Sequence, residues 1–262
     1  MKYGFIGCGN MGGAIARALH NATQDFLIAD QSEKAAALAQ ELGVAYGDNE
    51  TAVNSCDRLF LGVKPQMMRS VLTPLQGLLQ EKKPVLITMA AGLTTETIAA
   101  FAGCELPVIR IMPNTPVAVG KGMILYCRNA LVSDEILADI LSDMQFCGTL
   151  DALDEHLIDA ACSLSGCGPA YVYYFMDALA KGAVACGVPE EKALSYAAAT
   201  VAGAAQMLSA SGEAPQTLIN AVCSPGGSTL AGMHVLYESN FAETVAACIA
   251  AAYKRNQELG KG

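Results

Sequence analysis

The chain has 262 residues, 53% of them hydrophobic and 16% charged, so it is long enough to bury a large core without disulfides or metals. With a formal net charge of −9 and no cluster of Lys and Arg, it offers no basic face to nucleic acid. No apolar run suits a membrane span, and glycines interrupt the short N-terminal run, unlike a signal peptide; we therefore expect a cytoplasmic protein without membrane attachment.

Residues 1–150 are expected to form an α/β domain, because short apolar runs alternate with segments of helical periodicity. The predicted strands are Lys2–Ile6, Phe26–Ala29, Arg58–Gly62, Pro84–Thr88, Pro107–Ile111 and Met123–Cys127. The predicted helices are Met11–His20, Ser32–Leu42, Gln66–Leu79, Thr94–Phe101 and Ser133–Gln145. This alternation predicts a Rossmann-like, doubly wound parallel sheet.

Residues 151–262 show no strand signal and are predicted to form an all-α domain. The predicted helices are Asp154–Ser163, Ala170–Cys186, Pro189–Ser211, Pro215–Cys223 and Leu230–Leu259. Ala170–Cys186 is apolar around most of its circumference, which indicates a core helix or a subunit interface. Asp177 and Lys181 argue against a membrane helix there, and the apolar composition predicts an oligomer.

The cysteines and histidines indicate neither disulfides nor a metal site. Ten cysteines are scattered from Cys8 to Cys248 without a C-x-x-C pair, so free thiols are expected. The three histidines, His20, His156 and His234, lie far apart, and no zinc-ligand spacing occurs.

A glycine-rich loop follows the first predicted strand and opens the first predicted helix: Gly7, Cys8, Gly9, Asn10, Met11 and Gly12. In this context the G-x-G-x-x-G pattern indicates a dinucleotide-binding loop. Gly7 permits a tight turn, Gly9 lets the backbone approach a pyrophosphate, and Gly12 allows close packing of helix on strand. The helix N-terminus favours the phosphates. The alternatives are a turn without a ligand and the related loop of S-adenosylmethionine enzymes.

The residues after the second predicted strand bear on the choice of dinucleotide. Asp30 stands where a carboxylate accepts the ribose hydroxyls of NAD and repels the 2′-phosphate of NADP. Ser32 and Lys34 would receive that phosphate if Asp30 points away, so the residues alone leave NAD and NADP open. The loops Gly62–Pro65 and Met89–Gly92 also fall at the carboxyl edge of the sheet, where their small residues indicate either room for the nicotinamide ribose or tight packing.

Three polar clusters rich in glycine and proline interrupt the apolar sequence: Met112–Pro116, Ser165–Tyr171 and Ser224–Thr229. In the third cluster, consecutive glycines precede a helix and would present backbone N–H groups to a carboxylate, together with nearby hydroxyls. An ordinary N-cap with a glycine turn is the alternative.

On these residues the chain resembles the pyrroline-5-carboxylate reductase family over essentially its whole length. The resemblance rests on the glycine loop, Val63–Pro65 and the three clusters, above all Ser224–Thr229 running into Ala231–Leu236. It implies hydride transfer from NADPH or NADH to the imine carbon of 1-pyrroline-5-carboxylate, giving L-proline in the last step of proline biosynthesis. It also implies a homodimer whose intertwined C-terminal helices form a dimerisation domain and complete each active site. Further assembly of the dimers stays open.

The resemblance also implies roles for individual residues. Thr229 would hydrogen-bond the ring nitrogen, while Ser224 and the amides around Gly226 and Gly227, next to Ser228, would hold the carboxylate. The implied cofactor contacts are Asn49, Val63, Lys64, Pro65, Ala90 and Ala91. The family usually prefers NADPH, which conflicts with the interpretation of Asp30 alone.

Three positions depart from the family pattern. Cys167 replaces the usual serine of its cluster, and Ser228 stands where threonine is frequent. Ala214-Pro215 replaces a His-Pro pair, so no substrate role is assigned to that loop.

The expected chemistry needs little acid–base machinery, because the imine nitrogen can be protonated before it binds and the hydride comes from the cofactor. His234 is therefore interpreted as structural. A hydroxyacid dehydrogenase of the same two-domain plan is one alternative, which would want a lysine or histidine donor near the substrate hydroxyl. A non-catalytic dinucleotide sensor is the other, and in it Ser224–Thr229 would be only a turn.

Overall fold

The computed structural model describes residues 1–259 and divides into two compact units. Unit 1 is Met1–Cys167 together with the chain from Ala252 onward, and unit 2 is Gly168–Ala251. The domain boundary expected at residue 150 stays a prediction, since these units are defined by compactness alone. No helix among the described residues is both long and apolar enough to cross a membrane.

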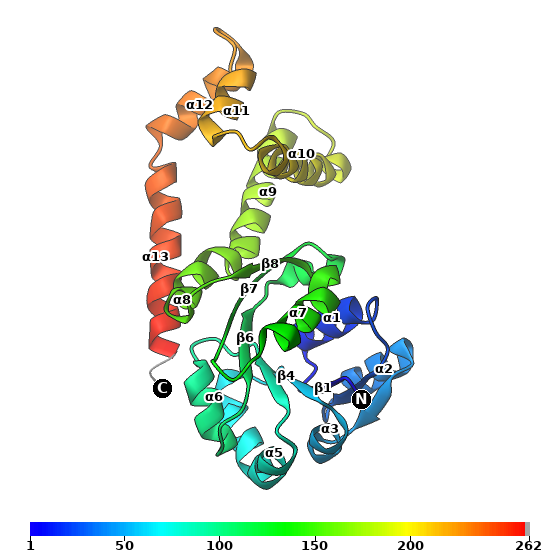
Figure 1. The fold of residues 1–262 in the computed structure, drawn as a ribbon. Coiled ribbons are helices and arrows are strands. Elements are labelled where there is room, and N and C mark those ends of the chain that lie inside the picture. The colour runs from blue at the N-terminus through cyan, green and yellow to red at the C-terminus, as the bar shows by residue number, and fades with distance from the viewer. Residues whose placement is uncertain (260–262) are drawn as a thin grey trace. The chain divides into compact units, whose positions relative to one another are not determined.

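Unit 1 is built on an eight-stranded sheet with the order β3-β2-β1-β4-β5-β6-β7-β8 (Figure 1). The strands are β1 Tyr3–Ile6, β2 Phe26–Ala29, β3 Ala45–Gly47, β4 Arg58–Leu61, β5 Val85–Thr88, β6 Val108–Met112, β7 Gly122–Arg128 and β8 Gly148–Ala152. Neighbouring strands are parallel except β6 and β7. The chain winds outward in both directions from β1 and β4, which confirms the doubly wound, Rossmann-like sheet.

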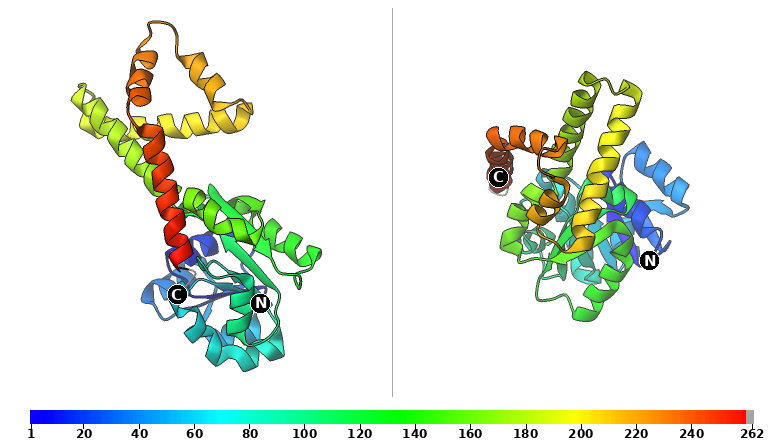
Figure 2. Two further views of the ribbon diagram at one scale, coloured as in Figure 1. Left: turned by 90° about the vertical axis from the view of Figure 1, so that its left-hand side faces the viewer. Right: turned by 90° about the horizontal axis from the view of Figure 1, so that it is seen from above.

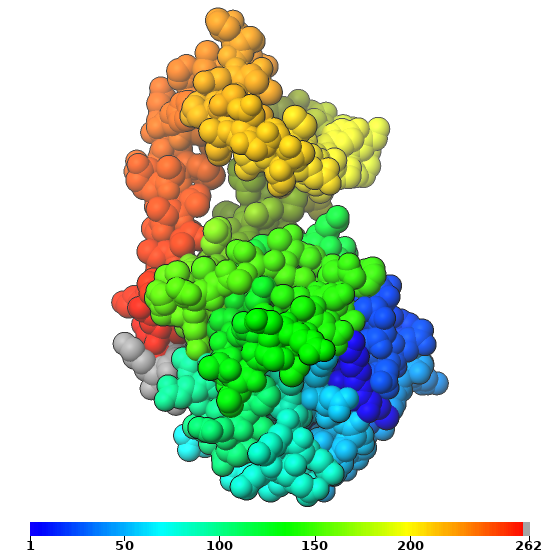
Figure 3. All heavy atoms as spheres, in the orientation of Figure 1, coloured from blue at the N-terminus to red at the C-terminus, as the bar shows by residue number. Residues whose placement is uncertain are grey.

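The inner strands are apolar because both faces of the sheet are covered. On one face Phe5 and Phe60 stack with ring centroids 4.7 Å apart, and helices α1 (Asn10–Leu19), α2 (Glu33–Leu42) and α7 (Asp134–Asp143) pack over them. The other face is covered by α3 (Asn49–Ser55), α4 (Met68–Leu72), α5 (Gln76–Lys82) and α6 (Thr95–Ala102). The atoms of this unit, blue to green in Figure 3, pack closely together.

Unit 2 is entirely helical, as predicted. Its helices are α9 Gly168–Ala185, α10 Glu190–Ser211, α11 Pro215–Val222, α12 Ser228–Glu238 and the first part of α13 Phe241–Leu259. Helices α9 and α10 form a hairpin (Figure 2), closed by a small core of Ala180, Ala193 and Ala197. The segment before unit 2, α8 (Glu155–Ser165), belongs to unit 1.

The structure corrects several predicted elements. The short strands β3 and β8 and helix α3 were not predicted from the sequence. The predicted helix Gln66–Leu79 is instead a series of short α and 3₁₀ segments, η1 Pro65–Met67, α4, η2 Thr73–Leu75 and α5, since Pro74 lacks the N–H that a continuous helix needs. The predicted helix Leu230–Leu259 is broken between Glu238 and Phe241 into α12 and α13.

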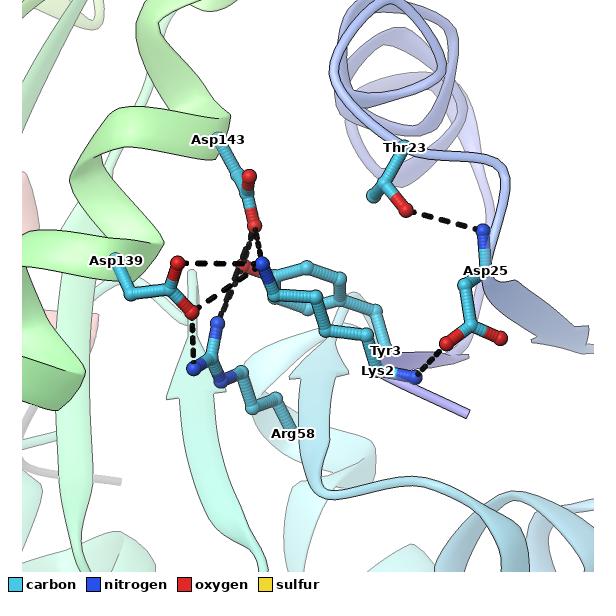
Figure 4. A network of polar contacts seen from close by, with 7 residues as sticks. All are labelled: Lys2, Tyr3, Thr23, Asp25, Arg58, Asp139 and Asp143. Carbon is cyan, nitrogen blue, oxygen red and sulfur yellow. Dashed lines mark hydrogen bonds and ion pairs between the residues drawn. The ribbon is translucent and has the colours of Figure 1, made fainter.

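A polar network holds α7 against the amino ends of β1 and β4 (Figure 4). Lys2 Nζ lies 2.7 Å from a carboxylate oxygen of Asp143, and Arg58 Nη2 lies 2.5 Å from one of Asp139. The Tyr3 hydroxyl donates to Asp143 and accepts from Arg58, at 2.7 and 2.9 Å. The hydrogen bond from Arg58 keeps the pKa of Asp139 below its ordinary value. This network ties the β7–β8 connection to the central strands.

The network predicts that Arg58→Met destabilises the protein far more than loss of a surface ion pair. The Arg58 side chain is only 12% exposed, so its removal leaves Asp139 and Asp143 without their main partner. We expect a loss of about 2–3 kcal/mol in the free energy of unfolding, measured in urea at fixed protein concentration.

Arg17→Met is the matched control, since Arg17 and Glu41 are 47% and 55% exposed and their ion pair should contribute less than about 1 kcal/mol. Equal losses in the two variants would show that the network around α7 adds nothing beyond a surface pair.

Candidate active site

The glycine loop joins β1 to α1 in the geometry that a dinucleotide requires. Gly7 has a φ of 83°, and its N–H donates to the carbonyl of Ala29 at 2.9 Å. Gly9 is the N-cap of α1, which has no side-chain cap and no acidic residue in its first turn. The first N–H groups of this helix therefore remain available to an anion.

Missing side chains make this loop possible. A Cβ on Gly12 would lie 2.9 Å from the Gly7 carbonyl oxygen, and a Cβ on Gly62 would lie 2.2 Å from the same atom. A Cβ on Gly9 would meet no atom within 4 Å. Gly9 therefore opens onto free space in which a pyrophosphate fits, whereas Gly12 and Gly62 allow the backbone segments to touch. The contact made by Gly62 was missed in the sequence, which offered only a lone glycine after a strand.

Asp30 lies just after β2 and joins two loops. Its carboxylate accepts the Cys8 N–H at 2.6 Å and the Ser32 N–H at 2.8 Å. Burial alone would raise the pKa of Asp30, but these hydrogen bonds outweigh it and hold the pKa below its ordinary value. The carboxylate is thus ionised at neutral pH and is directed at backbone N–H groups.

The side chains after Asp30 differ in their freedom. Ser32 is the N-cap of α2 and accepts the Ala35 N–H at 3.3 Å. Lys34 is exposed and has no ion-pair partner among residues 1–259. A free cation therefore stands within the first turn of α2.

The remaining residues predicted to contact the cofactor all follow strands of the parallel part of the sheet. Asn49 comes two residues after β3, Val63–Pro65 follow β4, and Ala90 and Ala91 follow β5. Because the carboxyl ends of parallel strands share one edge, the structure brings these loops to the same edge as Gly7–Gly12 (Figure 1). This edge contains the switch point between β1 and β4, where open α/β sheets bind ligands.

In unit 2, the Ser224–Thr229 loop forms a second opening for an anion. The Gly227 N–H donates to the Ser224 carbonyl at 2.9 Å, and Gly226 takes a φ of 74° in the turn between them. A Cβ on Gly227 would lie 2.6 Å from Ser224 Oγ, so this position also needs glycine. Gly227 is the N-cap of α12, again without a side-chain cap or an acidic residue in the first turn.

The chemistry on offer is binding and orientation rather than acid–base catalysis. Ser228 and Thr229 are the first two residues of α12 and are exposed, as is His234 farther along the same helix. Within the described part of the chain, no three His, Cys, Asp or Glu side chains are placed to hold a metal ion. Such an arrangement suits a reaction whose reactive group arrives with a cofactor.

Comparisons with known proteins point in the same direction. A family model described as NADP oxidoreductase coenzyme F420-dependent matches residues 2–92, and one described as pyrroline-5-carboxylate reductase dimerisation matches residues 155–259. Pyrroline-5-carboxylate reductase of Escherichia coli is 36% identical over 266 residues, covering 99% of this chain and 98% of that protein.

Solved structures agree over the same length. The pyrroline carboxylate reductase of Plasmodium falciparum, determined with NADP bound, is 30% identical with a TM-score of 0.89 and covers 99% of this chain and 98% of its own. The 1-pyrroline-5-carboxylate reductase of Streptococcus pyogenes is 34% identical with a TM-score of 0.90 and covers 98% of both chains.

The open space at Gly9 and the crowding at Gly62 predict opposite effects of adding one methyl group. Gly9→Ala should leave the free energy of unfolding unchanged but weaken dinucleotide binding at least about tenfold, because the methyl group occupies the space of the pyrophosphate. Gly62→Ala should lower the free energy of unfolding by about 1–3 kcal/mol, because the added Cβ overlaps the Gly7 carbonyl.

Gly77→Ala is the control, since a Cβ on this residue of α5 meets no atom within 4 Å. Dinucleotide affinity is measured by calorimetric titration and stability by urea unfolding. Unchanged affinity in Gly9→Ala would remove the pyrophosphate from this loop.

Proposed function

The chain belongs to the pyrroline-5-carboxylate reductase family, and we propose that its glycine loop and its Ser224–Thr229 loop together carry out that family's reaction. The protein is an NAD(P)H-dependent oxidoreductase that reduces the imine carbon of 1-pyrroline-5-carboxylate and yields L-proline, the last step of proline biosynthesis. The observation that carries the proposal is the pair of uncapped helix N-termini at α1 and α12, in a chain related to these reductases over 99% of its length.

At the cofactor end, the N–H groups at the start of α1 bind the pyrophosphate, and Gly9 leaves it room. The loops after β4 and β5, with Val63–Pro65 and Ala90–Ala91, border the nicotinamide ribose. When bound, the reduced dinucleotide supplies the hydride. The residues of the chain orient it and exclude water from the face that reacts.

At the substrate end, the Ser224 hydroxyl and the N–H groups around Gly226 and Gly227 bind the carboxylate of the substrate. The protein carries a net charge of −9, so an anionic substrate needs such a local site. Thr229 is the second residue of α12, and its hydroxyl hydrogen-bonds the ring nitrogen as the charge there changes. Because that nitrogen can bind a proton before it reaches the protein, no general acid is required.

Thr229→Val, which removes the hydroxyl but keeps the shape, should lower kcat about tenfold to a thousandfold, because one preorganised donor is lost. Thr229→Ser keeps the hydroxyl and should retain most of kcat. The measurement is oxidation of NADPH in the presence of 1-pyrroline-5-carboxylate, followed by absorbance, with the NADPH dissociation constant as a check on folding. Wild-type kcat in Thr229→Val would remove Thr229 from the reaction.

NADP(H) is the favoured cofactor, in spite of Asp30. The two backbone hydrogen bonds to the Asp30 carboxylate support a role in joining loops, and Lys34 offers a free cation for the 2′-phosphate. Ser32 stands beside it as the N-cap of α2 and as a second donor.

Lys34→Met should therefore weaken NADPH binding about tenfold, the effect of losing about 1.5 kcal/mol of charge-assisted hydrogen bonding, and leave NADH binding unchanged. Lys82→Met, at the end of α5 far along the chain from these loops, is the control and should change neither constant. Equal weakening of NADH and NADPH in Lys34→Met would contradict a contact with the 2′-phosphate.

A homodimer follows from the surface of unit 2. Large apolar side chains there are exposed, among them Tyr174 at 78%, Val235 at 67% and Val222 at 63%, and Figure 3 shows gaps between its helices. Such a surface is typical of helices that are covered by a partner subunit. The ten cysteines are free thiols, which supports a reducing, cytoplasmic location.

A further inference from the structure

The cluster Met112–Pro116 has no part in the reaction proposed above, yet its asparagine is almost completely buried. Asn114 lies two residues beyond the end of β6 and is 9% exposed. Its side-chain oxygen accepts the Met123 N–H at 2.9 Å, and its side-chain nitrogen donates to the Ser165 carbonyl at 2.9 Å. One carboxamide thus joins the end of β6 to β7 and to the last residue of α8.

Ser165 marks the point at which the chain leaves unit 1. Helix α8 ends there, and α9, the first helix of unit 2, begins at Gly168. The N–H groups of Gly166 and Cys167 both donate to the Cys162 carbonyl, at 2.8 and 3.1 Å. The Ser165 carbonyl, which has no partner within the helix, is taken by Asn114.

Helix α8 is held by polar side chains at three levels. At its start Glu155 accepts the Thr95 N–H at 2.7 Å, and one turn later Asp159 lies 2.5 Å from the buried Arg110. Its end is held by Asn114 alone among the polar side-chain contacts recorded for residues 1–259. Loss of this bond would free the last turn of α8 while its first two turns stay fixed.

The last turn of α8 matters for the reaction because the two binding loops lie in different units. The cofactor loops lie at the carboxyl edge of the sheet in unit 1, the edge at which β6 and Asn114 also end, whereas Ser224–Thr229 lies in unit 2. Hydride transfer needs the reacting atoms about 3–3.5 Å apart, and a misplacement of about 1 Å costs on the order of a hundredfold in rate.

We propose that Asn114 is a positioning residue for hydride transfer: it fixes the point from which unit 2 departs against the sheet edge that holds the cofactor loops. This inference rests on the proposed function. Asn114 touches neither substrate nor cofactor in this role and acts through the end of α8.

Asn129 provides a matched control. It directly follows β7, and its side chain makes the same kind of bridge: its nitrogen donates to the Leu106 carbonyl at 2.7 Å and its oxygen accepts the Val108 N–H at 3.1 Å. These contacts lie at the amino end of β6, away from α8. In both asparagines, substitution by aspartate keeps the acceptor and replaces the donor with an oxygen that faces a carbonyl.

The test compares full-length Asn114→Asp and Asn129→Asp. Both should lose similar melting temperature, but only Asn114→Asp should lower kcat, by about tenfold or more, while its NADPH dissociation constant stays within about threefold of wild type. The primary isotope effect with NADPH deuterated at the transferred position should rise in Asn114→Asp, because hydride transfer becomes slower relative to release of the product.

Equal values of kcat in the two variants, whether both near wild type or both reduced, would overturn the inference. If Asn114→Asp does not fold, Asn114→Ser removes the bond to Ser165 without adding a charge and is judged by the same criteria. A wild-type protein that binds NADPH but does not turn over would overturn the proposed function, and this inference with it. Turnover by the wild type beside an unaffected Asn114 variant overturns the inference alone.

Discussion

The contact of the Gly7 carbonyl with Gly12 and Gly62 sets the geometry on which the cofactor edge depends. A Cβ at either glycine would come within 2.9 Å of that oxygen, so the turn after β1, the start of α1 and the end of β4 fit together only without side chains. Asp30 adds a second constraint, since its carboxylate takes the N–H groups of Cys8 and Ser32 and links this loop to the next. Backbone packing, rather than charged side chains, thus shapes the site.

The same physical solution recurs in the helical unit. The helices α1 and α12 both begin after a glycine, without a side-chain cap and without an acidic residue in the first turn. In a chain with a net charge of −9, backbone N–H groups attract an anion without requiring a basic surface. A pyrophosphate at α1 and a small carboxylate at α12 are two uses of one device, and reduction of an imine asks for little more than their alignment.

The sequence predicted what local pattern determines. β2 was predicted at its exact bounds, and the glycine loop and the Ser224–Thr229 loop were singled out because glycine, proline and hydroxyl residues in apolar surroundings have few structural uses. The strands β3 and β8 were missed because both are short and largely exposed, so neither gives a continuous apolar run. The direction of the Asp30 carboxylate, the contact at Gly62 and the bridge from Asn114 to Ser165 are tertiary contacts, and no spacing in the chain encodes them.

The most direct measurement is turnover of 1-pyrroline-5-carboxylate by the purified wild-type protein, with NADPH oxidation and L-proline formation quantified in the same sample. The account predicts one proline for each NADPH oxidised and slower turnover with NADH. A folded protein that binds NADPH yet forms no proline with either cofactor would contradict it.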